Sequence, residues 1–418
     1  MTRVLLRVLL DAAIGAADAS VRLPPCLPPL SPSGQIVVIG AGKAAAIMAV
    51  ETARTYGRRA RGVVVTRHGY GLRPSESAGG IDVVEAAHPV PSPAALTAAD
   101  RMFSAVEGLA ESDTVICLLS GGGSALLERP APGLAFEDIR RINAALLAGG
   151  APIGQINVVR KHLSAIKGGR LAVAAWPARV VTFALSDVPG DDPSTIASGP
   201  TVADVSTCAE TLAILRRLGV AIPPDVEAAL VAGRWETPKP GDPRLARSSF
   251  HLIATPHDAL IAAASRARAN DFEVIDLGAA VQGEAVEVAN DHAVLALDVV
   301  RRGVRAVILS GGELTVTHDG VGAGGPNREY ALALAIALQG HPRIWALAAD
   351  TDGADGHPDA AGAIVTPDTL ARARALDLDP REALRTHDSA PFFRALGDDV
   401  VTGPTRTNVA DFRAIVVT

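Results

Sequence analysis

The stretch Gln35-Ile-Val-Val-Ile39, followed directly by Gly40-Ala-Gly-Lys43-Ala-Ala45, decides the fold class. Its first part is a β-branched apolar run typical of a buried strand, and the Ala-rich segment 43–53 predicts a helix. A strand, a glycine turn and a helix in this order form the opening unit of an α/β domain. The sequence therefore predicts a Rossmann-like N-terminal domain with a parallel sheet flanked by helices.

Buried strands and helical segments alternate along the rest of the chain. The expected strands are 62–66, 81–85, 113–119, 179–185, 251–255, 272–277, 305–309, 344–348, 362–366 and 414–417. The expected helices include 92–109, 163–175, 284–302 and 328–338. The Pro- and Gly-rich segment 238–243 is typical of a linker. We expect two α/β domains with largely parallel sheets, a Rossmann-like one over 1–240 and a smaller one over 241–418, with the active site in the cleft between them.

Composition and charge exclude several classes of protein. The 418 residues are 48% hydrophobic and carry a net charge of −6, which gives no support to nucleic-acid binding. Mean hydropathy is +0.26, but no apolar run reaches the ~18 residues that a membrane helix needs. Residues 1–10 predict an amphipathic helix, because Arg7 and Asp11 interrupt the apolar region of a signal peptide. Three distant cysteines fit neither a disulfide framework nor a zinc site, so we expect a cytoplasmic protein.

The turn from Gly40 through Gly42 to Ala45 has the spacing of a dinucleotide-binding fingerprint. Glycines in such a turn let backbone N–H groups approach a phosphate at the start of a helix. The next strand lacks the terminal acid that binds a ribose, although Arg67 leaves NADP open. Lys43 opposes the helix dipole, so we expect it to reach an anionic ligand; the alternative is a surface lysine that extends into solvent.

Two later strands also end in glycine turns. These are Ser120-Gly121-Gly122-Gly123-Ser124 in the first half and Ser310-Gly311-Gly312-Glu313 in the second. Bare N–H groups in such turns suit a phosphate or a carboxylate, and the alternative is a tight turn without a ligand. A hydrolase nucleophile at Ser124 is disfavoured, because the residue two positions later is Leu126 rather than glycine.

The segment Gly324-Gly-Pro-Asn327-Arg328 precedes an expected helix, with Pro and Asn typical of a helix start. Arg328 is again a cation at the end of a helix where the dipole disfavours it. Lys43 and Arg328 thus stand at equivalent places in the two halves and predict a polyanion held from both sides. Phosphoryl transfer requires such an arrangement, since its catalysis depends on positioning and charge neutralisation.

Acidic loops follow several strands and suit a hard cation such as Mg²⁺. The candidates are Asp187, Asp191, Asp192, Glu313, Asp350, Asp352 and Asp355. The alternative for most of them is helix capping and turn formation. The Asp-x-Asp-Gly stretch at 350–353 fails as an EF-hand, because its twelfth position is Ala361. A Walker A loop is absent, so a P-loop kinase is excluded.

A basic segment at 157–172 predicts a further contact with anions. Arg160, Ser164 and Lys167 have the spacing of one helix face. These side chains either clamp an acidic substrate or nucleotide phosphates, or they form a solvated basic face.

At these motifs the sequence resembles the glycerate 2-kinase family, also called the MOFRL family. The matching stretches occur in order along almost the whole chain, at 40–45, 120–126, 157–164, 167–172, 185–192, 198–201, 310–313, 324–329, 350–356 and 402–409. The family has two α/β domains facing a cleft, and it uses ATP with Mg²⁺ to phosphorylate D-glycerate at its 2-hydroxyl. Some members have been labelled hydroxypyruvate reductases. One departure is Arg406, where the family motif usually has glycine.

The resemblance assigns roles to the candidates above. It implies Lys43, Arg328 and Asp187 as catalytic residues, and Asp187, Asp350 and Glu313 as ligands of Mg²⁺. Arg160, Lys167 and Asn327 are the substrate-binding candidates. The nucleotide-binding candidates are Gly40, Gly42, Ser120, Gly121, Gly122, Gly123, Ser124, Gly311, Gly312, Glu313 and Asn408.

Three functions are then compared. A glycerate 2-kinase explains the glycine turns, the cations and the acidic loops together. An NAD(P)H-dependent hydroxypyruvate reductase explains only the turn at Gly40, and a non-catalytic binding module has no need of carboxylates at several strand ends. We expect the kinase, with ATP and D-glycerate as small-molecule partners and a homodimer left open.

Overall fold

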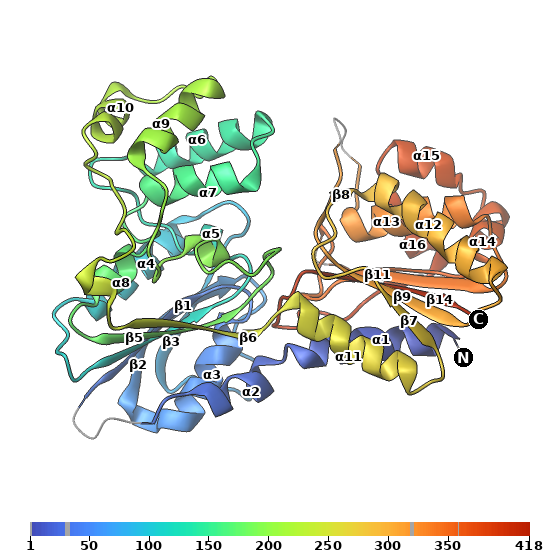
Figure 1. The fold of residues 1–418 in the computed structure, drawn as a ribbon, viewed down its shortest axis with the longest axis horizontal. Coiled ribbons are helices and arrows are strands. Elements are labelled where there is room, and N and C mark those ends of the chain that lie inside the picture. The colour runs from blue at the N-terminus through green and yellow to red at the C-terminus, as the bar shows by residue number, and fades with distance from the viewer. Residues whose placement is uncertain (1, 30–33, 318–321, 358) are drawn as a thin grey trace. The chain divides into compact units, whose positions relative to one another are not determined.

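A computed structural model describes residues 2–29, 34–317, 322–357 and 359–418. The chain divides into two compact units, and each is described by itself (Figure 1). The parallel-sheet unit comprises residues 19–185 and 191–253, and the mixed-sheet unit comprises 1–18, 186–190 and 254–418. No helix of the described residues has the length and apolar character needed to cross a membrane.

The parallel-sheet unit is built on a six-stranded sheet. Its strands lie in the order β3-β2-β1-β4-β5-β6. Their bounds are β1 (Ile36–Ala41), β2 (Ala60–Arg67), β3 (Gly80–Ala86), β4 (Thr114–Leu119), β5 (Arg179–Leu185) and β6 (Ser248–Ala254). Strand β1 pairs in parallel with β2 and β4, β2 pairs in parallel with β3, and β4 pairs in parallel with β5. This is the Rossmann order, and the strand order reverses between β1 and β4, where such sheets bind ligands at the carboxyl ends of the strands.

Helices cover both faces of this sheet (Figure 1). Helix α3 (Ala45–Tyr56) lies on one face, and α4 (Pro93–Val106), α5 (Gly123–Leu126) and α8 (Arg170–Ala174) lie on the other. The short helix α2 (Ala19–Arg22) packs against α3. Strand β1 is buried along its whole length, as the apolar run from Ile36 predicts.

Four further helices of this unit form a second hydrophobic core. They are α6 (Phe136–Ala148), α7 (Ile153–His162), α9 (Cys208–Arg217) and α10 (Pro224–Val231). Ile142, Val159 and Leu215 are completely buried in it. Thr207 caps α9 because its hydroxyl accepts from the N–H of Glu210, whose carboxylate accepts from the N–H of Thr207.

The expected helix over 163–175 is wrong for its first seven residues. Helix α7 ends at His162, and α8 begins only at Arg170. Between them Ser164 pairs with Pro130 in an isolated bridge, and Gly168 and Gly169 have φ values of +58° and +85°. These left-handed glycines break the helix, so Arg160, Ser164 and Lys167 do not share one helix face.

The mixed-sheet unit contains a second six-stranded sheet, in the order β13-β12-β11-β14-β9-β7. The strands are β7 (Glu273–Asp276), β9 (Ala306–Gly312), β11 (Ile344–Asp350), β12 (Gly362–Val365), β13 (Asp399–Val400) and β14 (Asp411–Val417). Within this sheet β7 and β9 pair in parallel, and the other pairs among its described strands are antiparallel. The sheet departs from the parallel pairing expected here, because an apolar run marks a buried strand without giving its direction.

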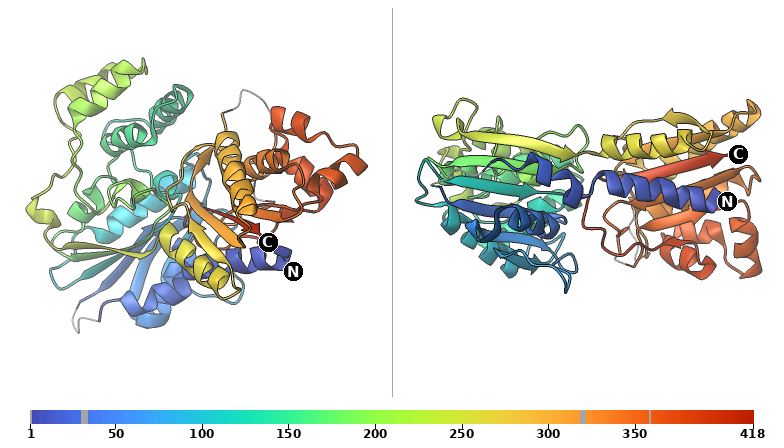
Figure 2. Two further views of the ribbon diagram at one scale, coloured as in Figure 1. Left: turned by 45° about the vertical axis from the view of Figure 1, so that its right-hand side comes forward. Right: turned by 90° about the horizontal axis from the view of Figure 1, so that it is seen from below.

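Helices also cover both faces of the mixed sheet. Helices α1 (Thr2–Ala16) and α11 (Pro256–Arg268) lie side by side on one face (Figure 2). Helices α12 (Ala285–Arg301), α13 (Pro326–Leu338), α14 (Thr369–Ala375), α15 (Pro380–Arg385) and α16 (Ser389–Leu396) lie on the other (Figure 1). The short strands β8 (Gly283–Glu284) and β10 (Leu314–Thr315) pair with each other. Single 3₁₀ turns occupy Pro24–Cys26, Gly57–Arg59, Ile196–Ser198 and Pro243–Leu245.

The two units differ from the domain bounds expected at residue 240. The amphipathic N-terminal helix is confirmed as α1, which buries Leu6, Leu9 and Leu10 against the mixed-sheet unit. Strand β6 follows the expected linker but extends the parallel sheet beside β5. The linker therefore lies within the parallel-sheet unit, and the division of the chain falls after Ile253.

The turn after β1 packs directly against the end of β4. Gly42 has a φ of +134°, and a β-carbon there would lie 2.4 Å from the carbonyl oxygen of Ser120 and 2.2 Å from its Oγ. Gly40 is equally close to β4, since its β-carbon would lie 2.3 Å from the carbonyl oxygen of Leu118. Only glycine allows these two strand ends to approach so closely.

This packing predicts a large difference between two glycines at opposite ends of α3. Gly42→Ala should lower the free energy of unfolding by about 3 kcal/mol or more, because backbone strain and overpacking add. Gly57→Ala is the control: Gly57 has a φ of +58° and open space around it, so only the strain of about 1 kcal/mol remains. Urea denaturation of both variants measures the difference, and equal losses would contradict the packing argument.

Candidate active site

The backbone of the turn at Gly40–Ala45 is already hydrogen-bonded. The N–H of Gly42 donates to Val65, that of Lys43 to the carbonyl of Gly121 at 3.0 Å, and that of Ala44 to Ser120 Oγ at 2.9 Å. Helix α3 begins at Ala45, so Lys43 precedes the first turn in which we expected it. The N–H groups that a dinucleotide pyrophosphate would need are therefore occupied, and the phosphate cradle expected at Gly40 and Gly42 is wrong.

The second glycine turn, after β4, contains backbone N–H groups that are not used in backbone hydrogen bonds within the described chain, unlike those of the first turn. Among the described residues, the N–H groups of Gly121 and Gly122 donate no backbone hydrogen bond, whereas Gly123 donates to Ser120. Gly122 has a φ of +79° and precedes helix α5. Ser124 Oγ lies 2.9 Å from Ser198 Oγ, so its hydroxyl is held beside the turn.

Lys43 lies across this second turn. Lys43 is 8% exposed, and its Cε would lie 3.6 Å from a β-carbon on Gly122. Lys43 thus lies over the glycine turn after β4 rather than the one after β1, and its contact with an anion stays a prediction. An ammonium beside bare N–H groups at the carboxyl edge of a parallel sheet is suited to an anion.

His88 completes this group, and the sequence analysis missed it. It follows β3, and its Nε2 would lie 3.0 Å from a β-carbon on Gly122. Burial, together with the charges of Lys43, Arg67 and Arg160, lowers the pKa of His88 to about 3. The sequence did contain a signal for His88, because it closely follows the expected strand that became β3. Parallel strands bring their carboxyl ends to one edge of the sheet, so a residue after β3 is expected near the residues after β1 and β4. The site is thus cationic without His88 carrying a charge.

Arg160 and Lys167, the substrate-binding candidates of this unit, both have protein partners. Arg160 Nε donates to Asn143 Oδ1 at 3.1 Å. Lys167 is completely buried and donates from Nζ to Glu128 Oε2. Burial lowers the pKa of Lys167, and the charge of Glu128 opposes that shift. Lys167 therefore neutralises a buried carboxylate, and it does not face solvent as a free substrate contact would.

Arg328, in the mixed-sheet unit, is also completely buried. Its Nε lies 3.2 Å from Asp355 Oδ2, its Nη2 lies 3.2 Å from Asp359 Oδ1, and its Nη1 lies 3.7 Å from Asp399 Oδ1. The cation expected to face a polyanion is instead surrounded by three carboxylates of its own unit. In this structure Arg328 therefore holds together the segments that carry these three carboxylates.

Asn327 and Asp355 form the start of helix α13. The N–H groups of Asn327 and Arg328 donate to the two carboxylate oxygens of Asp355 at 2.9 Å. Asn327 Nδ2 also donates to Asp411 Oδ1 at 2.6 Å, and Asn327 is 1% exposed. Burial raises the pKa of Asp355 to about 6, against the charge of Arg328, which lowers it. Asp355 therefore acts as a helix cap, the alternative kept open for the acidic loops.

The turn expected at Ser310-Gly311-Gly312 is part of strand β9. Gly311 and Gly312 pair with β14, and Arg413 Nη2 donates to their two carbonyl oxygens. A β-carbon on Gly312 would lie 2.3 Å from the carbonyl oxygen of Val281, so the glycine serves close packing. The phosphate turn expected here is wrong, because the backbone is committed to the sheet.

The three metal-ligand candidates belong to the mixed-sheet unit. Asp187 Oδ2 accepts from Asn408 Nδ2 at 2.9 Å. Asp350 ends β11 and accepts from the N–H of Asp352 at 2.8 Å, which is turn formation. Glu313 is exposed. Burial raises the pKa of Asp411, and the charge of Glu313 raises it as well, against the charge of Arg413, which lowers it. Within the described ranges, Asp187, Asp350 and Glu313 do not form a group of three carboxylates within 4.8 Å.

Local structure explains the role of Asp192 and the preference of the family motif for glycine at position 406. Asp192 accepts from the N–H and hydroxyl of Ser194, which confirms a turn-forming role. Arg406 has a φ of +63°, in the left-handed region that glycine adopts most readily. The backbone therefore explains why a glycine is usual at this position of the motif.

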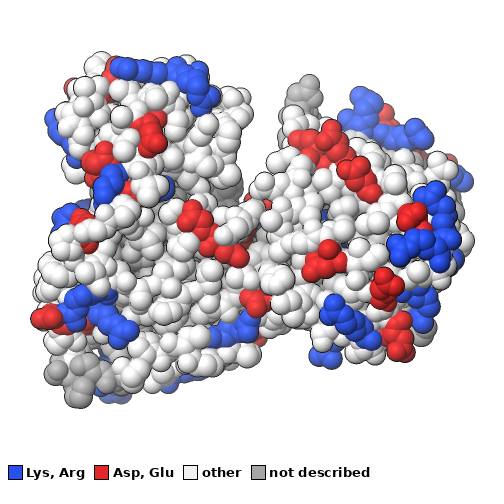
Figure 3. All heavy atoms as spheres, viewed as in Figure 1, with Lys and Arg blue, Asp and Glu red and all other residues white. Residues whose placement is uncertain are grey.

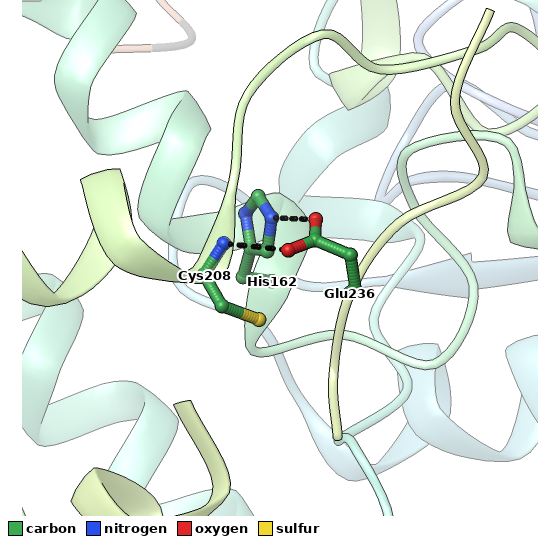
Figure 4. A group of neighbouring side chains, drawn as sticks. All are labelled: His162, Cys208 and Glu236. Atoms are coloured by element: carbon green, nitrogen blue, oxygen red, sulfur yellow. Dashed lines mark hydrogen bonds and ion pairs between the residues drawn. The ribbon is translucent and has the colours of Figure 1, made fainter. Parts of the chain in front are cut away.

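One cluster has the residue types of a metal site. His162, Cys208 and Glu236 place potential ligand atoms within 4.8 Å of one another (Figure 4). Glu236 already accepts from His162 Nε2, at 3.2 Å, and from the N–H of Cys208, at 3.1 Å, and it pairs with the ammonium of Lys239. Burial raises the pKa of Cys208 to about 11, so the sulfur is a thiol. These contacts tie α7 and α9 together and leave no ligand set for a metal.

Charges on the molecular surface are mixed in sign. On the face drawn in Figure 3, acidic and basic side chains are interspersed on each unit. The cationic group of the parallel-sheet unit is therefore defined by its position beside Gly122 rather than by an extended basic surface.

Comparisons with known proteins match this architecture. A domain of unknown function, DUF4147, matches residues 5–231, and the MOFRL family matches residues 306–411. A protein of Agrobacterium vitis named "Putative hydroxypyruvate reductase" is 49% identical, over 99% of this chain and 94% of its own length. The D-glycerate 2-kinase of Thermotoga maritima is 38% identical, over 90% of this chain and 89% of its own.

The structural comparison gives the same result. The crystal structure of glycerate kinase from Thermotoga maritima matches with a TM-score of 0.86 and 36% identity, over 99% of both chains. The chain is thus an α/β protein with one Rossmann-ordered parallel sheet and one mixed sheet, the architecture that the glycerate kinase structure also has. The chain belongs to the glycerate 2-kinase family, also called the MOFRL family.

Burial of Arg328 predicts a structural cost for its removal. Arg328→Ala should lower the free energy of unfolding by about 3–5 kcal/mol, because it leaves buried carboxylates unpaired. Arg385→Ala is the control, since Arg385 pairs with Glu382 at the surface, where solvent screens the pair, and its loss should leave the free energy of unfolding nearly unchanged. Thermal and urea unfolding measure both, and an unchanged stability of Arg328→Ala would contradict the buried cluster.

The lowered pKa of His88 predicts a pH dependence of stability. The unfolded chain takes up this proton near pH 6.5, whereas the folded protein takes it up only near pH 3. The contribution of His88 is therefore fully present above about pH 6.5 and is lost as pH falls from there toward 3. Between pH 7 and 5, His88→Gln should lose about 1–2 kcal/mol less unfolding free energy than the wild type. Identical pH profiles from urea titrations would show that His88 is not shielded.

Proposed function

We propose that the protein is an ATP-dependent glycerate 2-kinase, which transfers the γ-phosphoryl group of ATP to the 2-hydroxyl of D-glycerate. The observation that carries the proposal is Lys43, held across the turn of Gly121 and Gly122 at the reversal point of a Rossmann-ordered sheet. Related chains named glycerate kinase in Thermotoga maritima and Homo sapiens support the reaction class. The proposal includes D-glycerate as the phosphate acceptor and its 2-hydroxyl as the group that is phosphorylated.

In the proposed reaction, Lys43 neutralises charge that develops on the transferred phosphoryl group. The bare N–H groups of Gly121 and Gly122 donate to phosphate oxygens, and the neutral His88 packs beside them without adding charge. Catalysis of this kind depends on positioning and electrostatic stabilisation rather than on covalent chemistry.

Residues of the mixed-sheet unit have supporting roles in the proposal. Asp187, oriented by Asn408 at 2.9 Å, is the candidate to orient or deprotonate the substrate hydroxyl. Arg328 and Asn327 act as positioning residues, because both are buried and both bind Asp355. A direct contact of Arg328 with the phosphoryl group stays a prediction.

Mg²⁺ fits this chain through one or two carboxylates. Asp187 accepts from Asn408 Nδ2 and Asp350 accepts from the N–H of Asp352, and carboxylate oxygens are the hard ligands that Mg²⁺ requires. Glu313 is exposed at the end of β9. When bound, Mg²⁺ neutralises phosphate charge, and it commonly needs only one or two protein carboxylates together with phosphates.

A hydroxypyruvate reductase is the weaker function. The name of the Agrobacterium vitis relative suggests it, but the N–H groups of Lys43 and Ala44 are already bonded to the turn after β4. Strand β2 also ends at Arg67 without the acid that binds a ribose. We propose that the kinase acts in the cytoplasm, where its cysteines remain thiols, and the homodimer stays a prediction.

The test couples ADP formation to D-glycerate. Wild-type protein with ATP, Mg²⁺ and D-glycerate should form ADP, with 2-phosphoglycerate as the product identified by NMR. Lys43→Met should lower kcat by about 100-fold or more, because a charge-stabilising donor is lost while the side-chain volume is kept. Lys239→Met is the control and should retain activity, since Lys239 pairs with Glu236.

Two results would contradict the proposal. One is oxidation of NADH or NADPH with hydroxypyruvate in the absence of glycerate-dependent ADP formation. The other is a wild-type rate in Lys43→Met, which would remove Lys43 from the mechanism.

A further inference from the structure

A pocket of about 420 Å³ lies beside the cationic group in the parallel-sheet unit. It is bounded by the loop Pro89-Val90-Pro91, by helix α6 and by Arg160 of α7. Ser124 and Glu128, which follow the turn after β4, form its inner end. One residue of the pocket, Ser124, therefore directly follows the glycine turn that Lys43 crosses.

One wall of this pocket is apolar and open to solvent. Val90 is 53% exposed and Leu147 is 59% exposed, and both line the pocket together with Pro91 and Ala144. Large apolar side chains that face a common hollow leave surface that a ligand can cover. Such a wall suits a flat apolar group.

One acceptor oxygen at the inner end of the pocket has no hydrogen-bond donor beside it in the described part of the chain. Glu128 is 2% exposed, and its Oε2 accepts from Lys167 Nζ. Its Oε1 is buried and has no hydrogen-bond partner among the described residues. A buried carboxylate oxygen without a donor is costly, so a ligand that supplies an N–H or O–H group here would be favoured.

Size distinguishes between the two substrates of the proposed reaction. A volume of about 420 Å³ falls within the range of roughly 300–1,000 Å³ that holds drug-sized ligands. A three-carbon acid fills little of it and has no apolar face for Val90 and Leu147. A nucleoside offers a flat base for the apolar wall and hydroxyl or amino donors for Glu128.

We propose that this pocket binds the nucleoside of the phosphoryl donor, with Glu128 Oε1 as the acceptor of one of its N–H or O–H groups. The base lies on the wall formed by Val90, Pro91, Ala144 and Leu147, and the phosphates extend past Ser124 to the turn of Gly121 and Gly122. The inference rests on the proposed function in taking ATP as the donor. It assigns the specificity for a nucleotide to α6 and to the loop 89–91.

The test fills the pocket from an exposed position. Ala144→Trp, on the solvent-exposed side of α6, should weaken ADP binding at least tenfold by isothermal titration calorimetry. Ala148→Trp is the matched control: it lies at the end of the same helix, is exposed and does not line the pocket, so its affinity should be unchanged. Inorganic pyrophosphate, which lacks the nucleoside, should bind Ala144→Trp as it binds the wild type.

A second variant tests the acceptor. Glu128→Gln replaces an acceptor oxygen by an amide, so it should weaken ADP binding about tenfold while circular dichroism shows an intact fold. Unchanged ADP affinity in both Ala144→Trp and Glu128→Gln would overturn the inference. So would a wild-type protein that does not bind ADP.

Kinetics separates failure of this inference from failure of the proposed function. A raised KM for ATP in Ala144→Trp with an unchanged KM for D-glycerate supports the inference. A raised KM for D-glycerate with an unchanged KM for ATP would overturn it and leave the kinase standing. If the wild type forms no ADP with glycerate, the proposed function fails, while loss of ADP binding in Ala144→Trp still supports the nucleoside pocket.

Discussion

The close approach of the turn after β1 to the end of β4 is the constraint on which the candidate site depends. A β-carbon at position 42 would overlap with Ser120, and one at position 40 would overlap with Leu118, so both positions require glycine. Ser120 Oγ then accepts from Ala44, and the carbonyl of Gly121 accepts from Lys43. These contacts fix the start of α3 and leave the Lys43 side chain across Gly122. The position of one catalytic candidate thus follows from two glycines that contact no ligand themselves.

Buried charge has a different role in the mixed-sheet unit. Arg328 and Asp355 are both almost fully buried, and Asp355 caps the helix that begins at Pro326. Removing either charge would leave the other unpaired in a medium of low polarity, which is the expensive case for buried ion pairs. A conventional alanine substitution at Arg328 therefore reports on folding as well as on catalysis. A kinetic loss there is informative only when the stability of the variant is measured beside it.

The sequence predicted the Rossmann sheet because its signals are local. The apolar run from Ile36, the glycines after it and the Ala-rich helix each constrain the chain within a few residues. Strand direction in the mixed sheet could not be predicted, because β14 inserts between β9 and β11 from the end of the chain. The same limit applies to Ser310-Gly311-Gly312, whose pairing with β14 depends on residues about a hundred positions away. Motif spacing identified Lys43 and Arg328, but their burial and partners depend on tertiary contacts.

Labelling with a reactive acyl phosphate of ATP tests the central claim most directly, because such a probe acylates lysines beside the bound phosphates. The account predicts that mass spectrometry finds Lys43 acylated and that excess ATP prevents it. Lys239, 35% exposed at its side chain and paired with Glu236, is the internal reference and should react to the same extent with or without ATP. Acylation of Lys43 that ATP does not prevent, or its absence while Lys239 reacts, would contradict the placement of Lys43 at the phosphates.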